Sequence, residues 1–229
     1  MSFKFKEIYE NSIKNPEDFW KNVSDDIFWF KKPTKILNKS NPPFYKWFED
    51  GVTNTCYNAL DYHIDQGRGE KIALIYDSPI TGNKAKFTFN QLKAKVSKFA
   101  GALDSLGVKK GDRVIIYMPM IPEAVVAMLA CGRIGAIHSV VFGGFASNEL
   151  ASRIDDSKAK LLITASCGFE PGRTVEYRPL VDGALKLAKH KIEKVIFFQR
   201  KNNEVKLNAP TEISWDEALS NAKDKDCVE

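Results

Sequence analysis

Long apolar runs, paired cysteines and low-complexity tracts are all missing from this sequence of 229 residues. No apolar run approaches the roughly 20 residues that a membrane-spanning helix requires, so we expect no membrane partner. Residues 1–20 contain several acids and no arginine, and they lack the apolar core of a secretory signal. The sequence therefore predicts a cytoplasmic protein, in preference to one of the mitochondrial matrix.

Cysteine and histidine are few and dispersed. The four cysteines are Cys56, Cys131, Cys167 and Cys227, and the three histidines are His63, His138 and His190. None of them falls into the CxxC or CxH spacing that is typical of a zinc site or a disulfide framework. We therefore interpret the cysteines as reduced thiols and expect no metal site.

An excess of charge of one sign is missing as well. The net charge of +5 is mild for this length, and most lysines fall on predicted helix faces. A nucleic-acid groove would need denser lysine and arginine with interleaved aromatic residues. The lysines are better interpreted as a solvated surface, and we expect no nucleic-acid partner.

Aromatic residues, in contrast, are concentrated in residues 1–66. This segment shows little regular periodicity, and Pro33, Pro42 and Pro43 interrupt it. Such a segment is expected to lie over a larger domain and to pack through its aromatic side chains instead of folding alone. We therefore predict an irregular, aromatic-rich cap over residues 1–66 and a main domain over residues 67–229.

The main domain alternates between strand and helix patterns. Expected strands cover residues 71–76, 86–89, 113–118, 136–142, 160–165 and 195–199, and expected helices cover residues 90–106, 122–133, 147–156 and 180–189, with a last short helix after residue 214. Buried, nearly continuous apolar strands separated by helices are typical of a parallel sheet covered on both faces. The predicted fold class is α/β, with a mostly parallel, doubly wound sheet.

Helix start and stop signals support these boundaries. Asn90 is expected to cap one helix and Gly107 to end it, while Pro122 opens the next. Ser147 or Asn148 is expected to cap a third helix. Ser214, with Glu217 three residues later, predicts a capping box.

The usual nucleotide and hydrolase motifs do not occur. GxGxxG, GxxxxGK[ST] and GxSxG are all absent, and the adjacent acids Asp155 and Asp156 indicate a solvated helix end. One plausible ligand feature remains, the Gly143-Gly144 corner where an apolar strand meets a helix. Glycines at the carboxyl end of a strand can present backbone N–H groups to a phosphate, or they can simply form a turn. The residues leave both interpretations open.

A second loop follows the next strand and should emerge at the same edge of the sheet. Arg173, at the end of the run Cys167–Arg173, is suited to bidentate phosphate binding. An ion pair with Glu170 or Glu176 on the surface is the alternative. Spacing alone does not decide between the two.

These loops and their surroundings resemble the short-chain acyl-CoA synthetases, the AMP-forming acetyl- and propionyl-CoA ligases of the adenylate-forming superfamily. The motifs that carry the resemblance are NPEDFW (15–20), KWFEDGVTNTCYNALDYHI (46–64), FTFNQL (87–92), GVKKGDRVIIYMPMIPEAVVAMLACGRIGAIHSVVFGGFASNELASRIDDS (107–157) and GFEPGRTVEYRPL (168–180). It extends over essentially the whole chain and corresponds to the N-terminal third of that family. Residues 1–66 resemble its N-terminal cap, and residues 67–229 resemble an incomplete AMP-binding domain.

The resemblance implies ATP-dependent activation of acetate or propionate to an acyl-adenylate, followed by thioester formation with CoA, with Mg²⁺ neutralising the phosphates. It implies CoA contacts at Phe142, Gly143, Gly144, Glu170, Pro171, Gly172 and Arg173. The corner would border the CoA adenine, and Arg173 would pair with the 3′-phosphate. Many acetyl-CoA synthetases carry a second arginine where Glu170 stands, and a carboxylate there would repel the phosphate.

The family's ATP phosphate loop, which ends in Gly-x-Pro-Lys, does not occur in these 229 residues. We therefore assign no catalytic residue, expect only CoA contacts within this chain, and expect the isolated chain to be an inactive, truncated portion of the enzyme. Two alternatives stay open. One is a non-catalytic protein that binds CoA or a full-length paralogue, and the other is a truncated gene product without a function.

Overall fold

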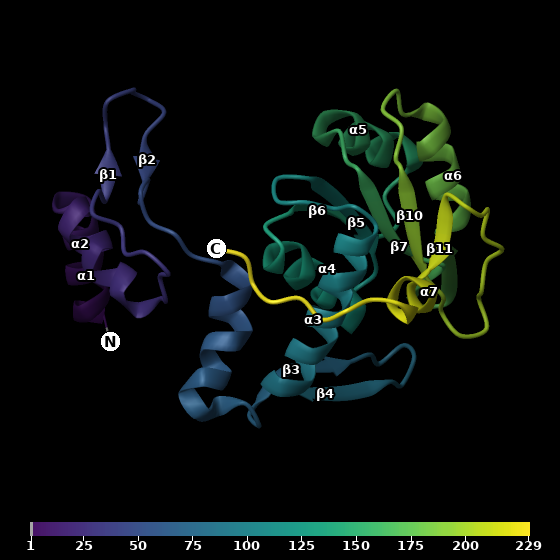
Figure 1. The fold of residues 1–229 in the computed structure, drawn as a ribbon, viewed down its shortest axis with the longest axis horizontal. Helices are drawn as coiled ribbons and strands as arrows, with labels where there is room; N and C mark the ends of the chain where they lie inside the picture. The colour runs from purple at the N-terminus through teal and green to yellow at the C-terminus, as the bar shows by residue number, and fades with distance from the viewer. Residues whose placement is uncertain (1) are drawn as a thin grey trace. The chain divides into compact units, whose positions relative to one another are not determined.

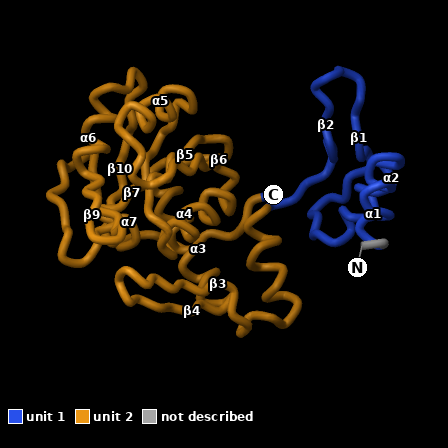
Figure 2. Tube along the Cα trace, turned by 180° about the vertical axis from the view of Figure 1, so that it is seen from behind, with its two compact units in different colours: residues 1–54, 229 blue, residues 55–228 orange. Residues whose placement is uncertain are grey.

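The structure, a computed structural model, describes residues 2–229 and divides into two compact units (Figure 2). The smaller unit extends to Asn54 and includes Glu229, and the larger unit extends from Thr55 to Val228. All the strands of the main sheet belong to the larger unit. That unit also holds every residue for which a ligand contact is expected.

The smaller unit is built on aromatic contacts. It contains helices α1 (Ser2–Lys14) and α2 (Pro16–Val23), the 3-10 turn η1 (Ser24–Asp26) and the short strands β1 (Leu37–Asn38) and β2 (Lys46–Trp47). The rings of Trp20 and Trp47 lie 6.2 Å apart, and those of Trp29 and Phe48 lie 5.5 Å apart. These ring contacts join α2 and the segment after η1 to the β1–β2 hairpin.

The larger unit begins with a helical segment that contains η2 (Tyr57–Asp61) and η3 (Ile64–Arg68). An antiparallel pair follows, β3 (Ile72–Asp77) and β4 (Lys84–Thr88). A tight turn joins them, in which the Gly82 N–H donates to the Ser78 carbonyl at 2.8 Å. Strand β4 leads directly into helix α3 (Phe89–Ser105).

A five-stranded parallel sheet forms the centre of this unit. Its strands are β5 (Arg113–Met118), β6 (Ile137–Phe142), β7 (Leu161–Ala165), β10 (Lys194–Phe198) and β11 (Glu212–Ser214), in the order β11-β10-β7-β5-β6. The inner strands β5 and β7 are buried along almost their whole length. This accounts for their continuous apolar sequences, because both faces of such strands are covered.

Helices cover both faces of the sheet, so the predicted doubly wound α/β fold is confirmed (Figure 1). Helix α3 packs against α4 (Pro122–Arg133) and α7 (Trp215–Ser220) on one side, and α5 (Ser147–Ser157) packs against α6 (Arg178–Leu187) on the other. The rings of Phe99 and Trp215 stack with centres 3.7 Å apart between α3 and α7. Both side chains are buried in the core.

Several predicted helix signals are confirmed and two are wrong. Pro122 opens α4, and Gly107 follows α3 with φ +86°. The predicted capping box at Ser214 forms in part: its hydroxyl accepts a hydrogen bond from the Glu217 N–H at 3.0 Å, and the structure of residues 2–229 records no reciprocal bond from the Glu217 side chain. The cap of α3 is Thr88, because its hydroxyl and the Gln91 side chain bond each other's backbone N–H groups.

The Asn90 side chain is drawn away from the helix end, since its amide donates to Glu70 at 2.7 Å. Helix α5 has no side-chain cap at its start. The Ser147 hydroxyl donates instead to the Leu180 carbonyl at 2.9 Å and so joins α5 to α6. In both cases a tertiary hydrogen bond takes the side chain that the local sequence assigned to capping.

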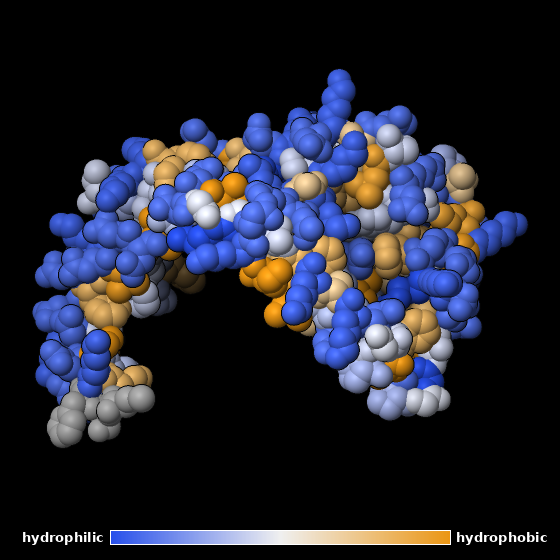
Figure 3. Space-filling model, turned by 90° about the horizontal axis from the view of Figure 1, so that it is seen from below, coloured by the Kyte–Doolittle hydropathy of each residue, from blue (hydrophilic) through white to orange (hydrophobic). Residues whose placement is uncertain are grey.

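Figure 3 shows hydrophobic residues on the surface as small groups among hydrophilic ones. Among residues 2–229, no helix has the length and the apolar character needed to cross a bilayer. The exposed apolar side chains include Ile137, Val140 and Phe142 of β6, one of the two edge strands of the sheet. An edge strand leaves one row of backbone groups without a neighbouring strand.

Candidate functional site

The carboxyl edge of the sheet contains a point where successive crossovers diverge. The loop after β5 leads to α4 on one face, and the loop after β6 leads to α5 on the opposite face. Ligands in open α/β sheets bind in the crevice at such a point. A pocket of about 340 Å³ lies there, and its lining includes Met118, Val140, Phe142, Gly143, Phe169 and Glu170.

The Gly143-Gly144 corner is a tightly packed turn. A Cβ atom at Gly143 would lie 2.2 Å from the Tyr177 hydroxyl oxygen and 2.8 Å from the Met118 carbonyl oxygen, so no side chain fits there. Gly144 has φ +97°, and the only atom within 4 Å of a Cβ built on it is a Glu170 carboxylate oxygen, at 3.9 Å. The surface above Gly144 is therefore open to a close approach.

The corner's amides, however, are used within the protein. The Gly144 N–H donates to the Tyr117 hydroxyl at 3.2 Å, and that hydroxyl donates to the Phe145 carbonyl at 2.7 Å. The Phe145 N–H donates to the Phe142 carbonyl at 3.2 Å. Of the two interpretations that the sequence left open, these contacts favour a turn over a phosphate cradle made by the Gly144 and Phe145 amides.

The second loop is a hairpin. Strands β8 (Cys167–Glu170) and β9 (Arg173–Glu176) are antiparallel, and Glu170 faces Arg173 across the turn. The Arg173 guanidinium bonds the Glu170 carboxylate at 2.6 and 2.8 Å, with 70% of the Arg173 side chain exposed. The structure thus realises the ion pair with Glu170. A ligand phosphate would have to compete with that carboxylate for Arg173.

The corner and the hairpin rest on a common tyrosine. A Cβ atom at Gly168 would lie 2.7 Å from the Tyr177 hydroxyl oxygen, which also lies against Gly143. The Tyr177 ring lies 5.0 Å from that of Tyr117. Burial raises the pKa of both tyrosines above its usual value near 10, so both hydroxyls stay protonated at neutral pH.

The seven residues singled out in the sequence fall into two groups. Phe142, Gly143 and Glu170 line the pocket, and Gly144 lies beside Glu170. Pro171, Gly172 and Arg173 form the exposed tip of the hairpin and do not belong to the pocket lining. The structure therefore brings the corner and the base of the hairpin together. Arg173 is linked to the pocket lining by its ion pair with Glu170.

Sequence reasoning missed Arg200, which also lines the pocket. Its guanidinium lies 4.7 Å from the centre of the Phe169 ring, and its backbone N–H donates to the Ser166 hydroxyl at 2.8 Å. Within residues 2–229 the structure records no ion pair for this side chain. Its position two residues after the end of β10, at the carboxyl edge of the sheet, was the available signal.

Comparison with known proteins agrees with this architecture. A family model described as AMP-binding enzyme matches residues 62–228, and a model of the acetyl-coenzyme A synthetase N-terminus matches residues 5–59. Acyl-CoA synthetase short-chain family member 3, mitochondrial, of Homo sapiens is 51% identical over 98% of this chain and 33% of its own length. Acetyl-coenzyme A synthetase of Streptomyces avermitilis is 45% identical over 92% of this chain and 32% of its own length.

Among solved structures, the acetoacetyl-CoA synthetase from Streptomyces lividans superimposes with a TM-score of 0.83 at 24% identity. It covers 96% of this chain, which corresponds to 33% of that protein. The likeness supports the fold. The chain spans about a third of the length of the curated relatives it matches.

The expectation of a cytoplasmic protein is wrong. Relatives that are 51–52% identical to this chain are mitochondrial proteins by name. The expectation rested on the acids and the missing arginine in residues 1–20. These features also fit a segment that folds as part of the protein, such as helix α1, so they do not report on a leader. Composition at the start of this sequence therefore does not determine the compartment.

The family assignment combines the matched models with the fold. The two models together match residues 5–59 and 62–228, and the relatives correspond to this chain over their N-terminal third. The chain belongs to the AMP-binding enzymes of the adenylate-forming superfamily and is a relative of the short-chain acyl-CoA and acetyl-CoA synthetases.

Proposed function

We propose that this chain is the CoA-binding portion of an AMP-forming ligase that activates a short-chain carboxylate, acetate or propionate. The carboxylate would attack ATP, whose phosphates Mg²⁺ would neutralise, to give an acyl-adenylate and pyrophosphate. The CoA thiol would then take the acyl group and release AMP. The relatives at 45–52% identity support this assignment. Residues 1–66 would serve as the cap, and residues 67–229 as part of the AMP-binding domain.

One observation carries the proposal for the CoA site. The corner and the hairpin, which follow different strands, meet around the same pocket at the carboxyl edge of the sheet. Phe142 is 67% exposed there and offers a flat apolar surface to a purine ring. Gly144 beside it allows the close approach that any larger residue would block.

Charge at this site is mixed, which shapes how a CoA phosphate would bind. Arg173 is held by Glu170, so a 3′-phosphate would replace the carboxylate as its partner. Arg200, whose guanidinium lies over the Phe169 ring, adds a second cation to the pocket lining. We include Arg200 with Phe142, Gly143, Gly144, Glu170, Pro171, Gly172 and Arg173 as the proposed CoA contacts.

Titration calorimetry of the chain with CoA tests the site. We expect Arg173→Ala and Arg200→Ala each to weaken binding about tenfold, the effect of one lost charge-assisted hydrogen bond. Arg153→Ala is the matched control, because Arg153 is an exposed arginine of α5 outside the pocket. Equal affinities for all three variants would refute the site.

A comparison with dephospho-CoA, which lacks the 3′-phosphate, identifies the interacting group. If Arg173 binds that phosphate, Arg173→Ala should weaken CoA but leave dephospho-CoA unchanged. An equal loss of affinity for both ligands would mean that Arg173 contacts a different group of CoA.

We also propose that these 229 residues alone make no acyl-adenylate, because their sequence contains no Gly-x-Pro-Lys loop. ATP–pyrophosphate exchange by the purified chain, dependent on acetate or propionate, would contradict this. The assay is independent of CoA binding, so the two parts of the proposal can fail separately.

The names of the relatives further lead us to propose a mitochondrial location for the full protein. Cell fractionation with an antibody against the chain would test this. Recovery in the cytosolic fraction alone would overturn it.

A further inference from the structure

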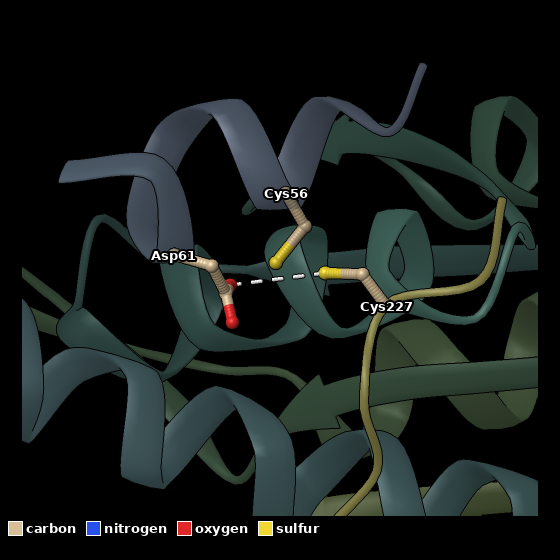
Figure 4. A group of neighbouring side chains, drawn as sticks. All are labelled: Cys56, Asp61 and Cys227. Carbon is tan, nitrogen blue, oxygen red and sulfur yellow. Dashed lines mark hydrogen bonds between the residues drawn. The ribbon is translucent and has the colours of Figure 1, made fainter. Parts of the chain in front are cut away.

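Four side chains from three distant segments of the larger unit meet in a cluster that shares no residue with the pocket lining. Cys56 and Asp61 lie in the helical segment that follows Asn54, and Cys227 lies in the tail after α7 (Figure 4). Arg133 is the last residue of α4. Cys56 and Arg133 are fully buried, and Cys227 is half-buried. The Sγ atoms of Cys56 and Cys227 and a carboxylate oxygen of Asp61 all lie within 4.8 Å of one another.

A metal ion is not the best occupant of this cluster. Arg133 Nη1 contacts Asp61 Oδ2 at 2.7 Å, Cys227 Sγ at 3.1 Å and Cys56 Sγ at 3.6 Å. All three atoms that could bind a metal thus share one guanidinium. Arginine stays charged at any physiological pH, so it would repel a second cation at the same position.

The tail that carries Cys227 is an ordered strap over α3 and α4. The Lys225 carbonyl accepts hydrogen bonds from the Ser97 hydroxyl at 2.6 Å and from Arg133 Nε at 2.5 Å, and the Val228 N–H donates to the Arg133 carbonyl at 2.9 Å. Gly101 of α3 lies so close that any Cβ there would collide with the Lys223 carbonyl. The strap, defined as residues 222–228, therefore presents Cys227 to Cys56 in a fixed position.

The environment activates Cys56 and leaves Cys131 inert. A hydrogen bond with Cys227 lowers the pKa of Cys56; burial opposes this shift, and Arg133 reinforces it. The same hydrogen bond and burial raise the pKa of Cys227, which therefore stays the protonated thiol of the pair. Burial without a cationic partner raises the pKa of Cys131 to about 12. Thiolate is the reactive form of cysteine, so oxidation should begin at Cys56, and the Cys227 sulfur within 4.8 Å is its nearest thiol partner.

We propose that Cys56 and Cys227 form a reversible disulfide in the presence of a peroxide and so fasten the strap to the helical segment after Asn54. One thiolate attacks the peroxide O–O bond, which gives a sulfenic acid and hydroxide. The second sulfur then attacks that sulfenic sulfur and forms the S–S bond, and the sulfenic oxygen leaves as water. For hydrogen peroxide, two thiols are oxidised, one peroxide is reduced and two waters are formed.

Hydrogen peroxide applied to the 229-residue chain tests the proposal by mass spectrometry. We expect the loss of two hydrogen atoms and, after blocking free thiols and digestion with trypsin, a species that joins residues 47–68 to residues 226–229. The Cys131→Ser/Cys167→Ser double variant is the matched control and should form the same bond. Cys227→Ser should not form it.

Thermal unfolding gives a second readout. The bond closes a long loop, so oxidation should raise the unfolding temperature of the wild type by roughly 5–10 °C, and dithiothreitol should reverse the shift. Cys227→Ser should show no shift.

The proposal is overturned if all four thiols remain free to alkylation after peroxide treatment. A bond to Cys131 or Cys167, a bond between two chains, or oxidation of Cys227 to the sulfinic acid would overturn it as well. These outcomes are read from the wild-type mass spectrum, so none of them depends on a variant that folds.

Discussion

At the scale of the residue, Glu170 governs the proposed CoA site. Its carboxylate bonds Arg173 across the hairpin turn and lies beside Gly144. Replacing it by Gln keeps the shape and removes the charge that competes with a phosphate. We expect Glu170→Gln to tighten CoA binding about fivefold, in line with the modest strength of an exposed ion pair.

Titration calorimetry with Glu176→Gln as the control distinguishes this local effect from a change in net charge. Glu176 is an exposed acid on the neighbouring strand β9. If Glu176→Gln tightened binding as much as Glu170→Gln, the effect would come from the general field of the protein.

Gly143 is required by the packing of the protein itself. Alanine there would drive its Cβ into the Tyr177 hydroxyl and the Met118 carbonyl, so we expect Gly143→Ala to lower the free energy of unfolding by about 2 kcal/mol in urea. In a Tyr177→Phe background, the same change should cost less, since one colliding atom is gone. An equal cost in both backgrounds would show that Tyr177 is not the obstacle.

At the scale of the element, the start of α3 separates two capping candidates. Thr88 makes the reciprocal bonds with Gln91, while Asn90 bonds Glu70. We expect Thr88→Ala to destabilise the protein by about 1 kcal/mol and Asn90→Ala by clearly less. Urea unfolding of the two variants measures the difference, and the reverse order would restore Asn90 as the cap.

Four of the five strands of the parallel sheet could be predicted, because burial on both faces leaves a simple mark in the sequence. The expected strand over residues 113–118 matches β5, and those of β6, β7 and β10 agree to within about two residues. The edge strand β11 was not predicted, because three residues are too few to show a pattern. Strands β8 and β9 were expected as a loop. They form a short hairpin outside the main sheet, where the alternation of exposed and buried residues is too brief to be distinctive.

The same limit applies to the site. The Gly143-Gly144 corner and the loop to Arg173 were visible in the sequence, because each follows a recognisable strand. The support from Tyr117 and Tyr177, and the place of Arg200 in the pocket, depend on which strands are neighbours. No local pattern encodes that order.

At the scale of the whole molecule, Arg133 connects segments that are far apart in the sequence. Its partners Asp61 and Cys227 are 72 and 94 residues away along the chain. The sequence could not show this cluster, because no local spacing joins these residues. Asp61 is also bonded by Lys93 at 2.9 Å. A buried cation that loses its carboxylate is costly, so the loss of Asp61 should destabilise the larger unit strongly.

We expect Asp61→Asn to lower the free energy of unfolding by about 3–5 kcal/mol at pH 7, whereas Asp77→Asn, which breaks an exposed pair with Lys84, should cost less than about 1 kcal/mol.

The pKa of Asp61 is lowered from its usual 3.8; burial opposes the shift, and the bonds from Arg133 and Lys93 outweigh it. The unfolded chain therefore takes up the proton first, so the contribution of Asp61 is full above its usual pKa and declines as the pH falls below it. Urea unfolding should show a smaller difference in the free energy of unfolding between the wild type and Asp61→Asn at pH 3 than at pH 7. A difference that is the same at both pH values would mean that Asp61 is not held as a carboxylate by Arg133.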